Sequence, residues 1–481
     1  MRLALRYLAP LCLALLLSTI PAAAQEAPPV SPISPSGAST TISLPIVMGP
    51  PAPPNPFGFD LRSYTGADVM PYVADVRPKW SRAGDLLWAY VEPVRGGGYR
   101  WETMAELDAN IQRLRQTGVE PMVVIQWSPP WAQSISGELC SPPRPEYVAD
   151  FARFVAAAAA RYSSGALQVD YWEIWNEPDY RADQVGAIDG TGCWASTTAP
   201  YYGGDYYGQV LRQVYPAIKG ANPRATVMAG AFTHFWPDDT VTVGFLRGML
   251  DAGAADSFDT LTFHAYGEWG AGDRLLFKAS SLRRTLQSYG ISKPLIATEI
   301  AATCVDQKGA PNNVACPTNF MQKQANYAAR IYAMAIALDL QGALWFTLAS
   351  ARPGFLESHL IDSTAGGLVP RPAYYSFRNS ALLLQGARYI GGPVAEPAAD
   401  QRGSVQVLTF QRGRSTLYVL WVPETSFPKS YNLPVPPGVT AICTDQLNLA
   451  TPATYYCSDA NNDGYIPRGV NELPQYVEIR P

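Results

Sequence analysis

The sequence is poor in the residues that most metal sites and nucleic-acid interfaces require. Its 481 residues include only three histidines, and neither a Cys-X-X-Cys motif nor a Cys/His cluster occurs. No zinc site is expected, and nothing points to another metal or an organic cofactor. Charged residues make up 16% of the chain, and the formal net charge is −4 with no basic run. No nucleic-acid partner is expected either, because contact with a phosphate backbone needs concentrated positive charge.

Long hydrophobic runs are also scarce, and the clearest one lies at the N-terminus. Arg2 and Arg6 precede an apolar stretch over 8–20, and the small residues 22–24 follow it. This is the pattern of a secretory signal peptide, and the apolar stretch is shorter than the roughly 18 residues of a membrane span. We therefore expect 1–24 to be cleaved, with the protein secreted to the periplasm or the extracellular space and not stably inserted in a membrane. An uncleaved membrane anchor is the alternative.

The cysteine count agrees with export. Of seven cysteines, Cys12 lies in the expected signal peptide, which leaves six. An even number in an exported chain indicates disulfides, although six cysteines allow many pairings. Proximity in sequence favours Cys304–Cys316 and Cys443–Cys457, which leaves Cys140–Cys193.

Three regions follow the signal peptide. Residues 25–56 are rich in Pro, Ser and Thr and are expected to form a linker that acts as a spacer. Over 57–385, short apolar runs alternate with amphipathic stretches, a pattern typical of βα units. The expected strands are 57–61, 78–83, 121–127, 169–175, 226–231, 259–266, 294–300 and 342–348. The amphipathic stretches are 101–116, 145–163, 205–220, 274–289, 319–340 and 372–385.

Eight such strands predict the fold class α/β, as a (β/α)₈ TIM barrel. A doubly wound open sheet could produce the same alternation, but polar, aromatic and acidic residues recur where the strands end. The carboxyl ends of the strands form the active-site face of a TIM barrel. After 385 the helical pattern stops, and 404–411 and 415–422 alternate around a turn with Gly413. Residues 386–481 are therefore expected to form a small C-terminal antiparallel β-sandwich domain.

The most informative segment is Trp-Asn-Glu-Pro at 175–178, which closes the fourth expected strand. It places the amide of Asn176 and the carboxyl group of Glu177 at the mouth of the barrel. Cleavage of a glycosidic bond needs a carboxylic acid near the leaving oxygen and a polar group near the sugar 2-hydroxyl. The seventh expected strand ends in Thr298-Glu299, which supplies a second carboxylate.

The two segments together resemble clan A of the retaining glycoside hydrolases, whose catalytic carboxylates lie on barrel strands 4 and 7. The order of motifs over about 57–385 is most similar to family 39 and its relatives, with families 5 and 30 behind. The resemblance implies that Glu177 is the acid/base, Glu299 the nucleophile and Asn176 a contact of the 2-hydroxyl. The loop 180–202 matches no pattern of the clan, so the resemblance does not name the sugar.

The resemblance also implies supporting roles for other strand ends. Arg82 would bond Glu299 and keep it ionised, with Arg62 as a competitor for this role. His264 and Tyr266 end the sixth strand, where the clan lines its site and contacts the nucleophile. Trp345 ends the eighth strand, where the clan often places a Trp beneath the sugar.

Other candidates are less distinctive. Trp127 and Trp131 flank a Pro-Pro pair and are candidates for a sugar platform, with core packing as the alternative. Glu92 is interpreted as structural. The segment 459–464 begins like a calcium loop, but Val470 stands where its last carboxylate is required, so a turn rich in Asp and Asn is favoured.

These observations predict a secreted retaining glycoside hydrolase that acts on a poly- or oligosaccharide by double displacement. The alternatives are a transglycosidase that uses the same residues, and a non-catalytic carbohydrate-binding protein on a barrel scaffold. The oligomeric state leaves no signature in the sequence.

Overall fold

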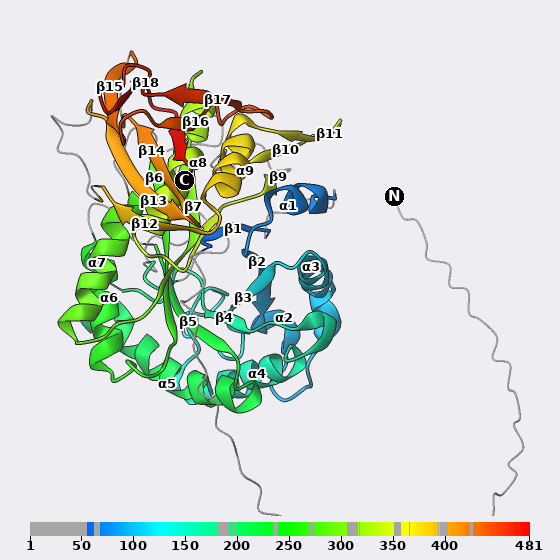
Figure 1. Cartoon of the computed structure of the whole chain (residues 1–481). Coiled ribbons are helices and arrows are strands. Elements are labelled where there is room, and N and C mark those ends of the chain that lie inside the picture. Colours follow the sequence, from blue (N-terminus) through cyan, green and yellow to red (C-terminus); the bar gives the residue numbers. More distant parts are fainter. Residues whose placement is uncertain are drawn as a thin grey trace, which may run out of the picture. The chain divides into compact units, whose positions relative to one another are not determined.

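A closed barrel of eight parallel strands forms the centre of the protein (Figure 1). The strands are β1 (Phe57–Asp60), β2 (Trp80–Leu87), β3 (Glu120–Gln126), β4 (Tyr171–Ile174), β5 (Thr226–Phe232), β6 (Thr260–Glu268), β7 (Leu295–Thr303) and β8 (Gly342–Trp345). Each pairs with the next along the chain, and β8 returns to β1, so the sheet has no edge. The prediction of a TIM barrel is confirmed, and the open sheet is excluded.

The computed structural model describes most of the chain after the linker. The described residues are 55–61, 68–180, 193–196, 198–233, 239–268, 274–304, 316, 318–350, 357–364, 366–392, 394, 403–423 and 427–481. The expected signal peptide, nearly all of the expected linker, Arg62 and much of the loop after β4 therefore lie outside the described residues. Among the helices of the described part, none combines the length and apolar character needed to cross a membrane.

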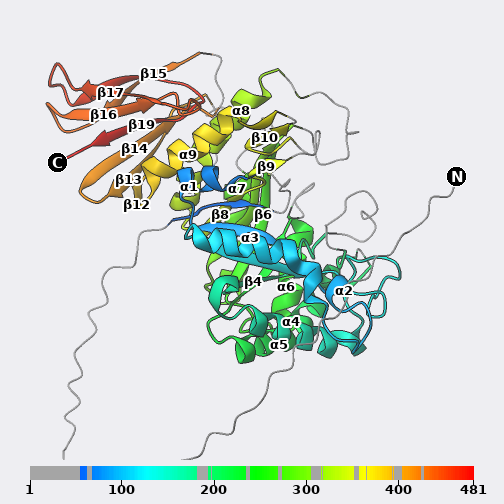
Figure 2. The same cartoon turned by 90° about the vertical axis from the view of Figure 1, so that its right-hand side faces the viewer.

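A helix follows every barrel strand and packs on the outside of the sheet (Figure 2). The helices are α1 (Met70–Val76), α2 (Trp88–Val91), α3 (Ala105–Gln116), α4 (Val148–Arg161), α5 (Gly204–Ala221), α6 (Thr240–Asp251), α7 (Arg274–Ser288), α8 (Phe320–Ala337) and α9 (Pro372–Leu384). All six predicted amphipathic stretches are helical over most of their length. The sequence pattern missed α1, α2 and α6.

The two ends of the barrel interior differ in chemistry. At the end where the strands begin, five side chains form a separate apolar cluster: Trp80, Met122, Met228, Ile296 and Leu344. Buried polar side chains, including Arg82, Glu173 and Glu299, occupy the other end. Polar side chains in the core cost free energy unless they bond to one another, so this end is where function is expected.

The C-terminal region is antiparallel, as predicted. Six strands pair in the order β12-β13-β14-β19-β16-β17, and β15 and β18 form a second sheet. Their bounds are β12 (Ala387–Gly391), β13 (Gln406–Arg412), β14 (Ser415–Trp421), β15 (Lys429–Pro434), β16 (Thr440–Asp445), β17 (Ala453–Ser458), β18 (Tyr465–Val470) and β19 (Gln475–Ile479). Leu433 of β15 and Ile466 of β18 pack with Leu420 and Val477 of the larger sheet, which makes a sandwich.

A small sheet that the sequence pattern did not predict lies between β8 and α9. It consists of β9 (Ala349–Ser350), β10 (Ile361–Thr364) and β11 (Gly367–Pro370). The backbone amide of Leu360 donates to the carbonyl of Thr347. The sheet therefore continues directly from the end of the last barrel strand.

All three predicted disulfides are present. Cys140–Cys193 joins the loops that follow β3 and β4, Cys304–Cys316 spans the connection from β7 to α8, and Cys443–Cys457 joins β16 to β17. The first two lie in loops at the polar end of the barrel, where cross-links limit the freedom of long connections.

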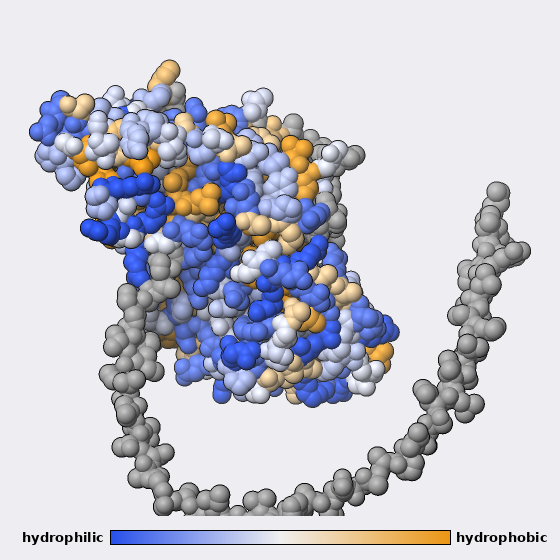
Figure 3. Space-filling view, turned by 45° about the vertical axis from the view of Figure 1, so that its right-hand side comes forward, coloured by the Kyte–Doolittle hydropathy of each residue, from blue (hydrophilic) through white to orange (hydrophobic). Residues whose placement is uncertain are grey.

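The surface of the described region is predominantly polar. On the face drawn in Figure 3, hydrophilic residues are widespread, and hydrophobic residues are interspersed among them in small groups. Scattered apolar residues of this kind are normal for a globular protein.

Candidate active site

Strand β4 delivers Glu177 to the polar end of the barrel through an unusual backbone. Trp175 and Glu177 adopt φ values of 72° and 50°, a region that residues other than glycine rarely occupy. Trp175 is held by its indole nitrogen, which donates to the carbonyl of Cys140 at 3.1 Å. The turn leaves Glu177 8% exposed at the strand end. Such local strain is typical of functional sites.

Irregularities in the barrel bring the other polar residues to the same place. The register of the β6–β7 pair shifts between Phe263 and His264, and that of the β7–β8 pair shifts between Ala297 and Ile300. A similar shift in the β2–β3 pair follows Arg82. Bulges of this kind re-aim side chains, and here they lie next to Arg82, His264 and Glu299. As a result, the Cα atoms of His264 and Glu299 are direct partners across the sheet.

Arg82 is the centre of the polar cluster. Its guanidinium donates to Glu299, to Asp60 at 3.3 Å, to Glu173 at 2.6 Å and to Asn176 at 2.9 Å. All five side chains are buried or nearly so. The structure thus brings Arg82 to Glu299, the residue with which the sequence associated it, and also to Asn176. Because Arg82 binds the carbonyl oxygen of Asn176, it also fixes the orientation of that amide.

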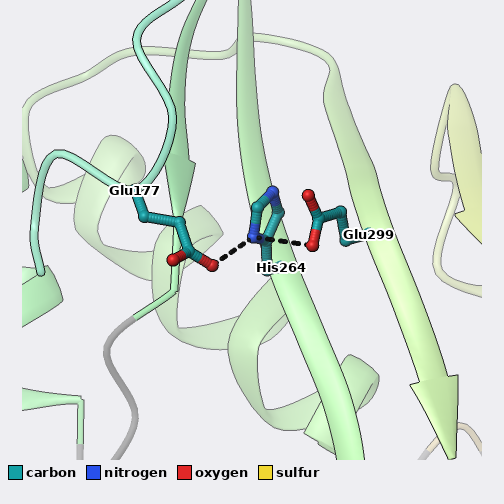
Figure 4. A group of neighbouring side chains, drawn as sticks. All are labelled: Glu177, His264 and Glu299. Atoms are coloured by element: carbon teal, nitrogen blue, oxygen red, sulfur yellow. Dashed lines mark hydrogen bonds and ion pairs between the residues drawn. The ribbon is translucent and has the colours of Figure 1, made fainter. Parts of the chain in front are cut away.

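The two predicted catalytic glutamates face each other across His264 (Figure 4). The Nδ1 atom of His264 lies 2.7 Å from Oε1 of Glu177 and 3.5 Å from Oε2 of Glu299. One oxygen of each carboxyl group and the ring nitrogen all lie within 4.8 Å of one another. The hydroxyl of Tyr266 donates to Glu299 as well. The four residues therefore form one contiguous site.

Glu177, His264 and Glu299 are also the group in the described region that could hold a metal ion, with one donor atom each. Two carboxylates and an imidazole suit a divalent transition metal. However, Glu299 already accepts hydrogen bonds from Arg82 and Tyr266. A guanidinium beside the donor set opposes a cation, so the arrangement favours proton transfer and nucleophilic chemistry.

Two residues of the cluster, Glu173 and Asp60, were not singled out by the sequence pattern. Glu173 binds Arg82 and accepts a hydrogen bond of 2.8 Å from the hydroxyl of Thr298, and Asp60 binds the other side of the guanidinium. The sequence feature that could have identified them is a charged residue within a strand that is otherwise apolar, at a position that faces the interior of the barrel. These contacts hold Arg82 in place, since a buried arginine needs several acceptors.

Two tyrosines near the end of β4 have raised pKa values. Burial, followed by the charge of Glu177, raises the pKa of Tyr180. Burial also raises the pKa of Tyr207, whose hydroxyl donates to the carbonyl of Ile174 at 2.6 Å and accepts from the amide of Gly230 at 3.1 Å. Tyr207 therefore acts as a hydrogen-bonding brace between the ends of β4 and β5.

A second buried polar network lies behind Glu177. The carboxylate of Asp179 accepts from the amide of Thr233 at 2.9 Å and from the hydroxyl of Thr242. Thr242 also contacts the ammonium of Lys278 at 3.1 Å, and this ammonium lies 3.2 Å from Asp239. The network links the turn after β4 to α6 and α7.

The predicted sugar platforms have different surroundings. Trp127 is half-buried, and its ring packs edge-on against exposed Tyr90 with centroids 5.8 Å apart. Trp131 donates to the carbonyl of Glu92 and packs against Trp88 and Tyr147. Both tryptophans are half-buried, so both remain candidates for contact with a ligand.

Trp345 packs toward the helix layer. It is 0% exposed, packs beside Tyr327 of α8 and donates to the carbonyl of Ser358 at 2.7 Å. The next residue, Phe346, lies edge-on to Tyr266 with ring centroids 6.0 Å apart. The ring of Trp345 thus packs toward α8, and Phe346 is the aromatic residue beside Tyr266, so a sugar contact of Trp345 stays a prediction.

The contacts of Glu92 and of the segment 459–464 agree with the structural roles expected for them. Glu92 accepts hydrogen bonds from the indole of Trp88 and the amide of Gly96. Asp459, in the turn between β17 and β18, accepts hydrogen bonds from two backbone amides of that turn and from the amide of Gly438. Burial raises the pKa of Asp459, but those amide hydrogen bonds outweigh it and leave the pKa lowered. This segment is the predicted turn rich in Asp and Asn.

Comparison with solved structures identifies proteins of similar fold. No family model matches the sequence, and no curated protein is significantly similar to it. Among solved structures, a family 39 glycoside hydrolase from Bacteroides cellulosilyticus is 20% identical, with a TM-score of 0.63 over 89% of this chain and 81% of that one. A family 30 subfamily 8 xylanase from Clostridium acetobutylicum is 12% identical, with a TM-score of 0.60 over 89% and 98%.

A conserved exported protein from Bacteroides fragilis is 13% identical, with a TM-score of 0.63 over 89% of this chain and 98% of that one. At these identities the likeness concerns the fold. The chain therefore shares its overall fold with a family 39 and a family 30 glycoside hydrolase.

Proposed function

We propose that this protein is an exported retaining glycoside hydrolase, with Glu299 as the nucleophile and Glu177 as the acid/base. The observation that carries the proposal is the pair of carboxyl groups at the ends of β4 and β7, with an oxygen of each within 4.8 Å. Retaining enzymes hold their carboxyl groups about 5–5.5 Å apart, whereas inverting enzymes need roughly 6.5–9.5 Å to admit a water. Export is supported by the N-terminal sequence pattern and by the three disulfides.

In the first step, Glu299 attacks the anomeric carbon while protonated Glu177 gives its proton to the departing oxygen. Arg82 and Tyr266 donate to Glu299 and so aim it and keep it ionised. In the second step, Glu177 takes a proton from water, and the oxygen of that water displaces Glu299 from the sugar. His264 contacts both carboxyl groups and orders them relative to each other. Asn176, oriented by Arg82, supplies the amide for the sugar 2-hydroxyl.

The test is hydrolysis of a panel of polysaccharides and aryl glycosides by the wild type, Glu177→Gln and Glu299→Gln. The panel includes xylan, because one structural relative is a xylanase. We expect each variant to lose at least about a thousandfold in rate, which is about 4 kcal/mol of transition-state stabilisation. Glu92→Gln is the matched control, because this buried glutamate binds only structural donors among those described.

The stereochemistry of the product provides a second readout. Proton NMR of the first sugar released should show the anomer of the substrate. Release of the opposite anomer would contradict the double displacement, and survival of activity in Glu299→Gln would place the nucleophile elsewhere. Products longer than the substrate would favour a transglycosidase. Binding without turnover in the wild type would favour a non-catalytic carbohydrate-binding protein.

A further inference from the structure

A cavity of ≈ 620 Å³ lies where the start of α8 meets the loops of the β-sandwich. Its size falls within the range of roughly 300–1,000 Å³ that is typical of small-molecule sites. Six side-chain amides line it: Asn319, Gln322, Asn326, Gln446, Asn448 and Asn471. A lining with this many carboxamides is unusual for a simple contact between two apolar layers.

The charges in the cavity cancel. Lys323 and Glu472 are its charged lining residues, and they pair with each other at 2.6 Å. A carboxamide both donates and accepts hydrogen bonds, as a sugar hydroxyl does. The lining therefore matches a neutral ligand with many hydroxyl groups better than it matches an ion.

Some of the six side-chain amides form hydrogen bonds that hold the barrel and the sandwich together, and others do not. Gln322 donates to Asn326 at 2.7 Å, and Asn326 donates to Glu472 at 3.2 Å. By contrast, the side chains of Asn319 and Gln446 form no hydrogen bond within the described part of the chain, and both are exposed. These two amides are available to a ligand.

The cavity also has an aromatic wall. Phe427 lines it and is 78% exposed. The C–H faces of a pyranose ring pack well on an aromatic face. Phe427 and Gln446 thus offer the apolar and polar contacts that a sugar unit needs.

The position of the cavity relates it to the catalytic carboxylates. Asn319 and Gln322 lie at the beginning of α8, which follows β7, the strand that carries Glu299. In a TIM barrel, each helix begins at the end where its preceding strand finishes, which is the active-site face. We propose that this cavity is a second, non-catalytic binding site for a neutral oligosaccharide segment, separate from the Glu177–Glu299 pair.

The test is affinity electrophoresis through gels that contain xylan, mixed-linkage β-glucan, mannan or galactan. All proteins carry Glu299→Gln so that the polymer stays intact. Relative to the parent that carries only Glu299→Gln, we expect the combination of Phe427→Ala and Gln446→Ala to weaken retention on at least one polymer about tenfold, which corresponds to about 1.4 kcal/mol. Tyr456→Ala is the matched control, because this tyrosine is 80% exposed on β17 and does not line the cavity.

Unchanged retention of the double variant, or retention of the parent by none of the four polymers, would overturn the proposal. Both substituted residues are exposed, so the thermal midpoint should not change. In the background with Glu299 intact, turnover of a small aryl glycoside should stay the same, since no residue of the Glu177–Glu299 site lines the cavity. The binding readout does not depend on catalysis, so it distinguishes failure of this site from failure of the proposed hydrolase activity.

Discussion

Two adjacent aromatic residues at the end of β8 have opposite surroundings, although sequence reasoning assigned the sugar contact to the first. Trp345 is buried against α8, and Phe346 lies against Tyr266. Successive side chains of a strand point to opposite faces, so only one of two neighbours can face the barrel mouth. The choice depends on the register at the strand end, which a pattern of apolar residues does not reveal.

Substitution of Phe346 should therefore affect catalysis, and substitution of Trp345 should affect stability. Phe346→Leu conserves most of the volume, so the free energy of unfolding should change by less than about 1.5 kcal/mol. Its kcat/KM should fall about tenfold, which is about 1.4 kcal/mol, because the ring beside Tyr266 is lost. Trp345→Phe should instead lower the free energy of unfolding by about 1–3 kcal/mol and leave KM unchanged, since it loses packing and the bond to Ser358. Urea unfolding and steady-state kinetics check both, and the reverse pattern would restore the original assignment of Trp345.

The sequence predicted most of the polar residues that the structure brings together. They are Arg82, Asn176, Glu177, His264 and Glu299. Each stands at or just after the end of an expected strand, so the barrel topology alone predicts that they converge. The sequence did not identify Glu173 or Asp60, because their importance comes from partners 91 and 22 residues away. Long-range hydrogen bonds of this kind have no local signature.

At the scale of elements, α6 shows why one helix escaped prediction. Gly244 and Gly248 interrupt its apolar pattern and lower its helix propensity. In the structure, a Cβ atom on Gly248 would lie 2.3 Å from Tyr201, and one on Gly244 would lie 2.6 Å from the ring of Tyr202. The glycines are therefore required by close packing, which overrides propensity.

The link between α6 and α7 depends on a buried ion pair. Lys278 of α7 lies 3.2 Å from Asp239, and both side chains are buried. Lys278→Met should lower the free energy of unfolding by about 3–5 kcal/mol, because it leaves Asp239 buried without its cation. Adding Asp239→Asn should restore part of the loss, and a double-mutant cycle measured by urea unfolding gives the coupling. Simple additivity of the two substitutions would show that the pair is not coupled.

The small sheet after β8 contains a pH-sensitive group. Burial, and then the charge of Arg371, lower the pKa of His359 from its ordinary value of 6.5. The folded state therefore favours the neutral ring, and its contribution to stability is complete above pH 6.5. This contribution is lost as the pH falls toward the folded pKa, with a slope of at most about 1.4 kcal/mol per pH unit.

Urea unfolding between pH 7.5 and 5 should accordingly show a steeper loss of stability for the wild type than for His359→Gln. The variant retains a side-chain nitrogen to donate to Asp362, which lies 2.8 Å from Nε2 of His359. The pKa of Asp362 is also lowered, because hydrogen bonds from Arg371 and His359 outweigh burial, but that contribution is lost only below its ordinary 3.8. Parallel pH profiles for the two proteins would contradict the assignment.

At the scale of the whole described region, one part of the β-sandwich belongs to the hydrophobic core of the barrel, while the rest forms a cluster of its own. Side chains of the sandwich belong to the same cluster as the barrel helices: Leu408, Phe410, Leu417, Val419, Trp421, Leu447 and Tyr476. Polar contacts add to it, since Tyr476 donates to the carbonyl of Ala329 at 3.1 Å and Asn379 donates to that of Leu447 at 2.7 Å. The sequence predicted the sandwich from its alternation but not this shared core, because alternation shows that a strand has an apolar face without showing what covers it.

Removal of the sandwich should therefore unfold the barrel. Each buried side chain of this kind contributes about 1.5–3 kcal/mol by transfer from water, so the seven together contribute on the order of 10–20 kcal/mol. This equals or exceeds the 5–15 kcal/mol by which a typical domain is stable. A chain that ends at 385 should be insoluble or should lack a cooperative transition, whereas the full chain should unfold in a single calorimetric transition. Two resolved transitions, or a soluble truncated barrel with unchanged kcat/KM, would show instead that the sandwich is an independent unit that happens to lie against α8 and α9.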